Sequence, residues 1–200
     1  MRAAVSWEAT VFAEGDERSC ADVAMDRYAD GDDVAFEVLY DELAPRLYRY
    51  ALRETHSRSA SEDVVQQVLL QMHAARARFA RGAAVLPWAY AIARRLLVDG
   101  RRHAARWASA GDRVALVEVA SGGVAADDAL DGRRREAELE RDLSSLPAKH
   151  REAFAMVKLE GLSIADAAAV LGISEGNVKV RVHRAAEALR TADARRRREP

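Results

Sequence analysis

Basic, amide and hydroxyl side chains near the end of the chain have the composition of a DNA-binding surface. At about 100° per residue, Lys179, Val180 and Arg184 lie opposite or beside an apolar stripe that begins at Val178. Basic side chains can bind phosphates, and a valine can contact a thymine methyl group in the major groove. The candidate residues of this surface are Ser174, Glu175, Asn177, Lys179, Val180, Arg181 and Arg184.

Two helices joined by a tight turn must position this surface. Ser163 can cap the first helix, and Gly172 follows it, where a positive φ is easily adopted. Ile173 would fill the angle between the helices and Ser174 would cap the second one, whose stripe is predicted to be Val178, Val182, Ala186 and Leu189. An ordinary helical hairpin is the alternative, but the combination of these residues with the small Ala168 favours a DNA-binding helix-turn-helix.

Residues suited to catalysis or metal binding do not form a constellation. The acid pairs Asp32-Asp33 and Asp127-Asp128 fall in turn or linker sequence without a histidine or nucleophile nearby. Cys20 is the one cysteine, and the five histidines show no metal-ligand spacing. We therefore expect no enzyme, no cofactor and no metal.

Charge divides the chain into four blocks. Residues 1–42 carry 3 Arg and 12 acids, and residues 43–108 carry 12 Arg and 4 acids. Residues 109–143 carry 5 Arg and 9 acids, and residues 144–200 carry 11 basic residues and 7 acids. Two basic blocks suggest two surfaces for a polyanion, although solvated helix faces would look similar. No apolar stretch approaches the ~18–20 residues of a membrane span, and the acidic N-terminus is unlike a signal peptide. We therefore expect a cytoplasmic protein with no membrane insertion.

Hydrophobic spacing predicts an all-α protein with two small helical domains joined by a flexible linker. Apolar residues recur from Phe36 to Tyr50, with a kink or boundary expected at Pro45, and a serine cap at Ser59 or Ser61 opens the next helix. A further helix is expected from Pro87, and another over 148–159. The predicted divisions are an acidic extension (1–21), a first domain (22–107), a Gly/Ala/Asp-rich linker (108–132), a second domain with the helix-turn-helix (133–192) and a basic tail (193–200).

Both domains resemble those of extracytoplasmic-function (ECF) sigma factors of the sigma-70 family. The segment from Leu146 to Leu189 resembles their region 4. In the first domain, Glu62-Asp63-Val64-Val65-Gln66 resembles the polymerase-binding helix of region 2, and the segment from Trp88 to Arg94 resembles its promoter-melting segment. The resemblance covers about residues 22–192, in the order and spacing of the family.

The resemblance implies a sigma factor that binds core RNA polymerase and directs promoter recognition and opening. Asp63, Gln66 and Gln67 would bind the clamp of the largest subunit. The minus-ten element would be read and melted by Trp88, Tyr90, Arg94, Arg95, Asp99, Arg101 and Arg102, although core packing is favoured for Trp88 taken alone. The helix-turn-helix would read the minus-thirty-five element of the promoter DNA, and its domain would dock on the flap of the second-largest subunit. An anti-sigma factor is an expected partner.

The sequence departs from the family at two positions. Arg95 stands where Asn is common, which leaves the preferred minus-ten base open, and His73 replaces a usual Trp in the polymerase-binding helix. The rival interpretations are a free-standing helix-turn-helix regulator and a sigma mimic that binds an anti-sigma factor without polymerase. The first would need a receiver domain with strands, and the second should lose the basic face that Lys179, Arg181 and Arg184 retain.

Overall fold

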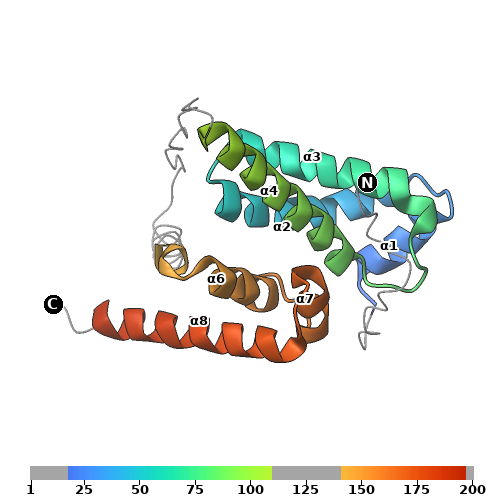
Figure 1. Ribbon diagram of the computed structural model, residues 1–200. Coiled ribbons are helices and arrows are strands. Elements are labelled where there is room, and N and C mark those ends of the chain that lie inside the picture. Colours follow the sequence, from blue (N-terminus) through green and yellow to red (C-terminus); the bar gives the residue numbers. More distant parts are fainter. Residues whose placement is uncertain (1–17, 110–140, 197–200) are drawn as a thin grey trace, which may run out of the picture.

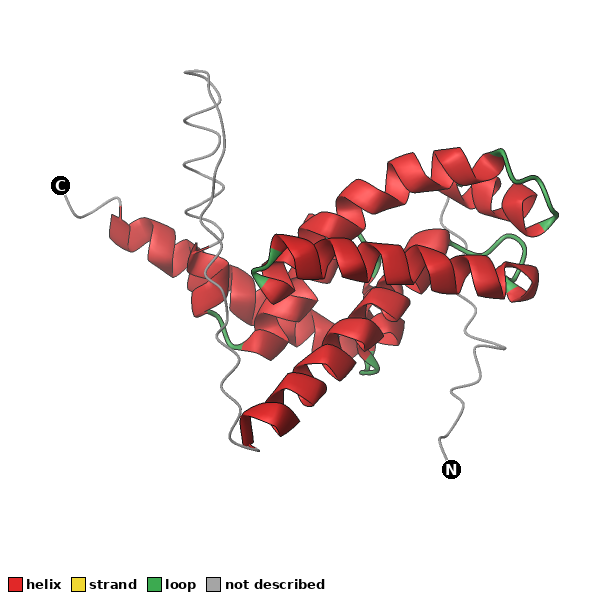
Figure 2. Ribbon diagram, turned by 90° about the horizontal axis from the view of Figure 1, so that it is seen from above, coloured by secondary structure: helices red, strands yellow, loops and turns green. Residues whose placement is uncertain are grey.

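The computed structural model describes residues 18–109 and 141–196, with side chains described as far as His103 in the first range (Figures 1 and 2). The first range holds helices α1 (Cys20–Ala29), α2 (Ala35–Thr55), α3 (Arg58–Ala75) and α4 (Val85–Ser109), with a 3₁₀ turn, Arg76–Arg78, after α3. The second range begins with helical residues 141–145. It continues with α6 (Ala148–Phe154), a π-helical turn (Ala155–Leu159), α7 (Ile164–Leu171) and α8 (Glu175–Arg196). These ranges contain no strand, so the all-α prediction is confirmed.

The first domain is a bundle in which α2 packs against α1, α3 and α4. The apolar face predicted for α2 is buried through Leu39, Leu43, Leu47 and Tyr50. Pro45 does not end or divide this helix, which is continuous over 21 residues. An internal proline costs roughly 3 kcal/mol, and burial of the leucines on both sides of it offsets that cost.

Short polar contacts set where the other helices of this domain begin. The cap of α3 is Ser57, whose side chain accepts from the backbone N–H of Ala60, and not Ser59 or Ser61 as the sequence predicted. Ser61 is instead buried, and its hydroxyl donates to the carbonyl of Ser57 at 2.6 Å. Helix α4 begins two residues before Pro87, because Asp22 of α1 accepts from the backbone N–H of Val85 at 2.7 Å.

In the second domain, α8 packs against α6 and α7. Leu143 and Leu146 contact the middle of α8 around the buried Ala185. The helix expected over 148–159 exists, but its second half is the π-helical turn, which leads to the buried Glu160. Helix α8 continues to Arg196, which binds Asp142 at 2.6 Å, so the first part of the predicted basic tail is helical.

The two domains pack directly on each other. Helix α7 lies against α4, and buried apolar residues of both domains form one continuous cluster. Figure 1 shows α6 and α7 between α8 and the first domain. The predicted linker from residue 110, the extension up to residue 17, residues 133–140 and the tail from 197 lie outside the described residues.

Candidate DNA-binding and polymerase-binding interfaces

The turn between α7 and α8 has the geometry that the sequence predicted. The Ser163 hydroxyl accepts from the backbone N–H of Asp166 at 3.0 Å and donates to its carboxylate at 2.6 Å. Gly172 ends α7 with φ 67°, in the left-handed region, where a residue with a Cβ is strained. Ile173 is half-buried, and Ser174 accepts from the backbone N–H of Asn177 at 3.3 Å. The helix-turn-helix is thus fixed by two serine caps and one glycine.

The outward face of α8 carries the candidate DNA-binding side chains. Lys179, Val180 and Arg184 are exposed, and Val180 is 49% exposed although it is apolar. Arg181 is half-buried and donates to the Asn177 side chain at 3.0 Å. The remaining members, Ser174, Glu175 and Asn177, are exposed at the start of the helix. An exposed apolar side chain between basic ones suits a surface that contacts both phosphates and bases.

The buried stripe of α8 differs from the prediction in its second half. Val178 and Val182 are buried as expected, but the third buried residue is Ala185, while Ala186 and Leu189 are half-buried. Ala185 lies seven residues after Val178, two helical turns on, where it meets Leu143 and Leu146.

A second polar face lies on α3. Asp63, Gln66 and Gln67 are exposed on this helix, and the opposite side buries Val65, Val68, Leu69 and Met72. Helix formation therefore presents the three predicted polymerase-binding side chains together, because positions three and four apart share one face.

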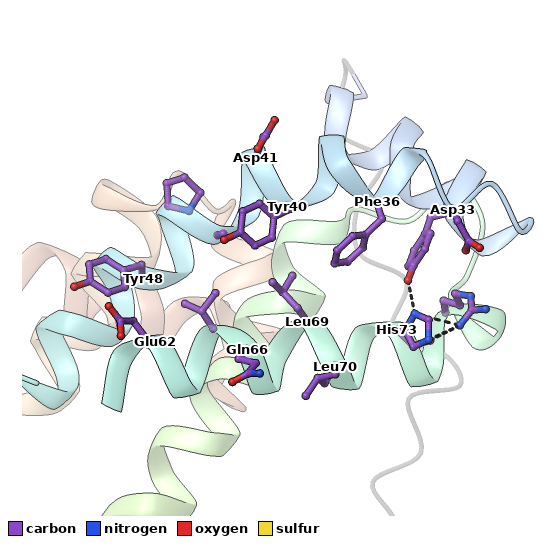
Figure 3. Close-up of a pocket in the computed structure, with 15 residues that line it drawn as sticks. Asp33, Phe36, Tyr40, Asp41, Tyr48, Glu62, Gln66, Leu69, Leu70 and His73 are labelled. Atoms are coloured by element: carbon purple, nitrogen blue, oxygen red, sulfur yellow. Dashed lines mark hydrogen bonds between the residues drawn. The ribbon is translucent and has the colours of Figure 1, made fainter. Parts of the chain in front are cut away.

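An open groove of about 990 Å³ runs between α2 and α3 beside this face (Figure 3). Its lining is largely apolar and includes Tyr40, Leu69 and Leu70, and Figure 3 shows Leu69 pointing from α3 towards α2. Tyr40 and Leu70 are each about half exposed, so the groove presents apolar surface to solvent. Carboxylates of Asp33, Asp41 and Glu62 lie along its rim.

His73 closes one end of this groove. The Tyr28 hydroxyl is hydrogen bonded to its Nδ1, and Arg76 Nη1 lies 3.1 Å from its Nε2. The Arg76 guanidinium also lies over the Tyr28 ring, 5.5 Å from its centroid. Burial raises the pKa of Tyr28, and the charge of Arg76 lowers it in part. The histidine that replaces the usual tryptophan is thus held in a polar cluster at the edge of the groove.

Four of the seven predicted minus-ten residues lie on the exposed surface of α4. Arg95, Asp99, Arg101 and Arg102 are exposed. Arg95 lies 4.0 Å from Asp99, and Arg101 donates to Glu54 of α2 at 2.6 Å.

Of the other three predicted minus-ten residues, Trp88 and Tyr90 are buried and Arg94 is half-buried. Trp88 is buried against Phe79, with ring centroids 5.1 Å apart, which agrees with the core packing that the sequence favoured for Trp88 taken alone. Tyr90 is completely buried, makes a T-shaped contact with Tyr50 and donates its hydroxyl to Glu160. Arg94 donates to Glu152 at 2.7 Å. In this packing of the domains the expected basic surface therefore keeps Arg95, Asp99, Arg101 and Arg102 but not Arg94, which the second domain engages through Glu152. The assignment of these residues to the minus-ten element stays a prediction.

The contacts between the domains contain charged residues that the sequence interpretation missed. Glu160 is only 4% exposed and is bound by Arg53 as well as by Tyr90. Arg151 of the second domain approaches Glu54 of the first, 3.9 Å away. The spacing of Arg46, Arg49 and Arg53, three and then four residues, could have revealed a basic row on α2. No sequence pattern indicated that Glu152 and Glu160 of the second domain would pair with arginines of the first.

The arginines of this basic row affect the pKa of the Tyr90 phenol. Burial raises the pKa of Tyr90 to about 12, and the positive charges of Arg46, Arg53 and Arg49 lower it in part. The three arginines are therefore close enough to act on the Tyr90 phenol, and Arg53 of this row binds Glu160 of the second domain.

Other kinds of site are not found in the described ranges. No group of three or more His, Cys, Asp or Glu side chains in residues 18–109 and 141–196 could hold a metal ion. Of the helices described, none is long and apolar enough to cross a bilayer.

The fold and the two faces define a helical protein of two packed domains, the second of which carries a helix-turn-helix. Residues 39–107 match the family Sigma-70 region 2, and residues 136–189 match the family Sigma-70, region 4. The chain is 34% identical over 166 residues to the RNA polymerase sigma factor CarQ of Myxococcus xanthus, covering 83% of this chain and 93% of that protein. It is 38% identical over 168 residues to the ECF sigma factor SigF of Caulobacter vibrioides, covering 82% and 89%. The chain belongs to the sigma-70 family, as an ECF RNA polymerase sigma factor, and it functions in promoter recognition and transcription initiation.

Solved structures agree on the fold. The chain is similar to the sigma factor RpoE in complex with the anti-sigma factor NepR from Bartonella quintana, with a TM-score of 0.62 and 26% identity over 78% of this chain and 94% of that one. It is similar in fold to CnrH in complex with the cytosolic domain of CnrY, with a TM-score of 0.65 and 21% identity over 88% and 99%.

Proposed function

We propose that this sigma factor binds core RNA polymerase through α3 and reads a promoter with two separate surfaces. The observation that carries the proposal is the pairing of an exposed polar face on α3 with an exposed helix-turn-helix face in a chain that holds both sigma regions. Its role is binding and strand opening without covalent chemistry, and its place of action is the cytoplasm, where polymerase and promoter meet.

Asp63, Gln66 and Gln67 are the proposed contacts to the clamp of the largest subunit. They are exposed, hydrogen-bonding and adjacent on α3, and Gln66 also lines the groove between α2 and α3. A partner helix laid along α3 could bury apolar surface in the groove and hydrogen bond to these side chains at its edge.

The helix-turn-helix is proposed to read the minus-thirty-five element as duplex DNA. Lys179 and Arg184 would contact phosphates, and Val180 would contact a base edge. Part of the same domain would dock on the flap of the second-largest subunit.

The first domain is proposed to melt and hold the minus-ten element. Arg95, Asp99, Arg101 and Arg102 offer an exposed, mainly basic surface for the strand backbone. Extruding one base costs a few kcal/mol, which backbone contacts and a protein pocket would offset. Tyr90 and Arg94 could join this surface only after the second domain moves away from them.

An anti-sigma factor is a proposed regulator. The solved structure of RpoE that resembles this chain contains the anti-sigma factor NepR. The groove with its apolar floor and acidic rim is a surface on which a helix of such a partner could compete with polymerase.

The test is capture of core RNA polymerase by the full chain, wild type against Asp63→Ala/Gln66→Ala. The matched control is Cys20→Ser/Val23→Ala, which changes two exposed residues of α1. We expect the wild type and the control to bind and the α3 variant to lose binding. Folded wild-type protein that fails to bind would contradict the proposal and favour a free-standing regulator or a sigma mimic.

A further inference from the structure

The contact between the two domains joins a basic surface of the first to an acidic edge of the second. Arg46, Arg49 and Arg53 lie along one side of α2, and Arg94 follows Tyr90 by one turn of α4. These four arginines and the Tyr90 hydroxyl form one surface, here called the arginine face. Its arginines supply planar donors of the kind that bind carboxylates and phosphates equally well.

Two carboxylates of the second domain occupy the arginine face. Glu160, at the end of the π-helical turn, is bound by Arg53 and by the Tyr90 hydroxyl, and its side chain is almost fully buried. Glu152 of α6 accepts from Arg94 Nε at 2.7 Å, with both side chains less than one-third exposed. The second domain thus brings two negative groups to a surface whose donors suit an anionic chain.

This occupation has a physical cost that makes it reversible. Burying the Glu160 carboxylate is unfavourable unless its partners compensate for the lost water, and a buried ion pair contributes little net stability. The closed arrangement then depends on the apolar packing of α7 on α4 together with these pairs. A competing polyanion can replace the carboxylates at small net cost, because it satisfies the same donors.

We propose that the arginine face is a binding site for unpaired DNA, and that Glu152 and Glu160 fill it as an intramolecular competitor when the domains are closed. The proposal rests on the proposed function, in which the first domain holds a melted strand, and it adds the α2 arginines to the strand path. Duplex DNA on the helix-turn-helix is a separate interaction. A closed chain would bind single strands weakly, and opening would expose the face.

The experiment measures binding of a fluorescein-labelled oligodeoxythymidylate of about 12 nucleotides to the full chain by fluorescence anisotropy. Wild type is compared with Glu152→Gln/Glu160→Gln. The matched control is Glu187→Gln/Asp193→Asn, which also removes two negative charges from the second domain, but from α8, away from the contact between the domains. Adding Arg46→Ala/Arg49→Ala to the first variant tests the site itself.

Opening is followed separately by energy transfer between labels on the native Cys20, which is exposed on α1, and on Ala188→Cys, at an exposed position of α8. We expect the glutamine variant to open and to bind the oligonucleotide about tenfold to a hundredfold more tightly, since a charge-assisted hydrogen bond contributes roughly that factor. The α2 substitutions should remove the gain, and the α8 control should show none.

Three results would overturn the proposal: opening without tighter binding, neither opening nor tighter binding, or an equal gain in the α8 control. If the double variant does not fold, as judged by circular dichroism, Glu152→Gln alone tests the same prediction at a more exposed position. The assay needs no polymerase. A wild type that fails to capture polymerase would therefore refute the proposed function while the competition between carboxylates and DNA remains measurable.

Discussion

Replacing Lys179 and Arg184 by alanine is the sharpest perturbation of the helix-turn-helix surface. Both side chains are exposed on α8, and neither forms an ion pair with a described residue. The double substitution Lys179→Ala/Arg184→Ala therefore removes two positive charges from the DNA-facing side without breaking a pair within the protein.

The size of the effect follows from counterion release. Each phosphate neutralised on B-DNA contributes about 0.9 to the slope of log K against log salt, so two lost contacts flatten that slope by about 1.8. Between about 50 and 200 mM salt, a fourfold change, the advantage of the wild type over the variant should shrink by about twelvefold. The variant should bind more weakly at low salt and approach the wild type as salt rises.

The assay is a salt titration of holoenzyme binding to a duplex selected from random sequence by the wild-type holoenzyme. The matched control is Arg190→Ala/Arg195→Ala, which removes two exposed charges of α8 beyond the helix-turn-helix. A variant slope equal to that of the wild type, or an equal flattening in the control, would refute the assignment of this face to DNA.

Three further predictions concern stability, measured by urea denaturation of the full chain. Gly172→Ala should lower the free energy of unfolding by about 1–2 kcal/mol through backbone strain alone, since φ is 67° and no neighbouring atom lies within 4 Å of the added Cβ. The control Gly176→Ala in α8 should not destabilise the protein. Equal effects of the two substitutions would contradict the strained turn. Ser163→Ala should cost about 1 kcal/mol by removing the cap of α7, and no loss would mean that Asp166 satisfies the helix end without it. Because folding raises the pKa of Tyr90 to about 12, this residue contributes about 3 kcal/mol to the free energy of unfolding below pH ~10, and the contribution is lost as pH rises towards ~12. Tyr90→Phe should remove this part of the alkaline loss of stability. A Phe variant with the same alkaline loss would refute this cause.

The Tyr90 prediction also connects with the contact between the domains. The hydroxyl that must stay protonated is the one that donates to Glu160, so alkaline ionisation would place two negative charges side by side. Tyrosinate absorbance recorded alongside the energy-transfer signal should show the domains separating as Tyr90 ionises.

Much of the helical framework could be predicted from the sequence because it depends on local rules. Apolar residues three and four apart predicted α2, and Ser163, Gly172 and Ser174 predicted the turn of the helix-turn-helix. The same periodicity placed Asp63, Gln66 and Lys179 on exposed faces, since a helix separates its polar and apolar sides without help from the rest of the chain.

Where local signals competed, tertiary packing decided the outcome. Pro45 indicated a boundary, but the buried leucines around it keep α2 continuous. Ser59 and Ser61 were equally plausible caps, and only the contacts of Thr55 and Ser57 show that Ser61 belongs in the interior.

The sequence by itself determined the helical class and the exposed faces of α3 and α8, because each of these depends on spacing within a single helix or turn. The two sigma regions followed from its resemblance to ECF sigma factors. Only the tertiary structure decided the state of Tyr90 and Arg94, which have the residue types of a strand-binding surface but are covered by the second domain. The pairing of Arg53 with Glu160 joins residues 107 positions apart, and no local pattern encodes which distant carboxylate will neutralise a basic face.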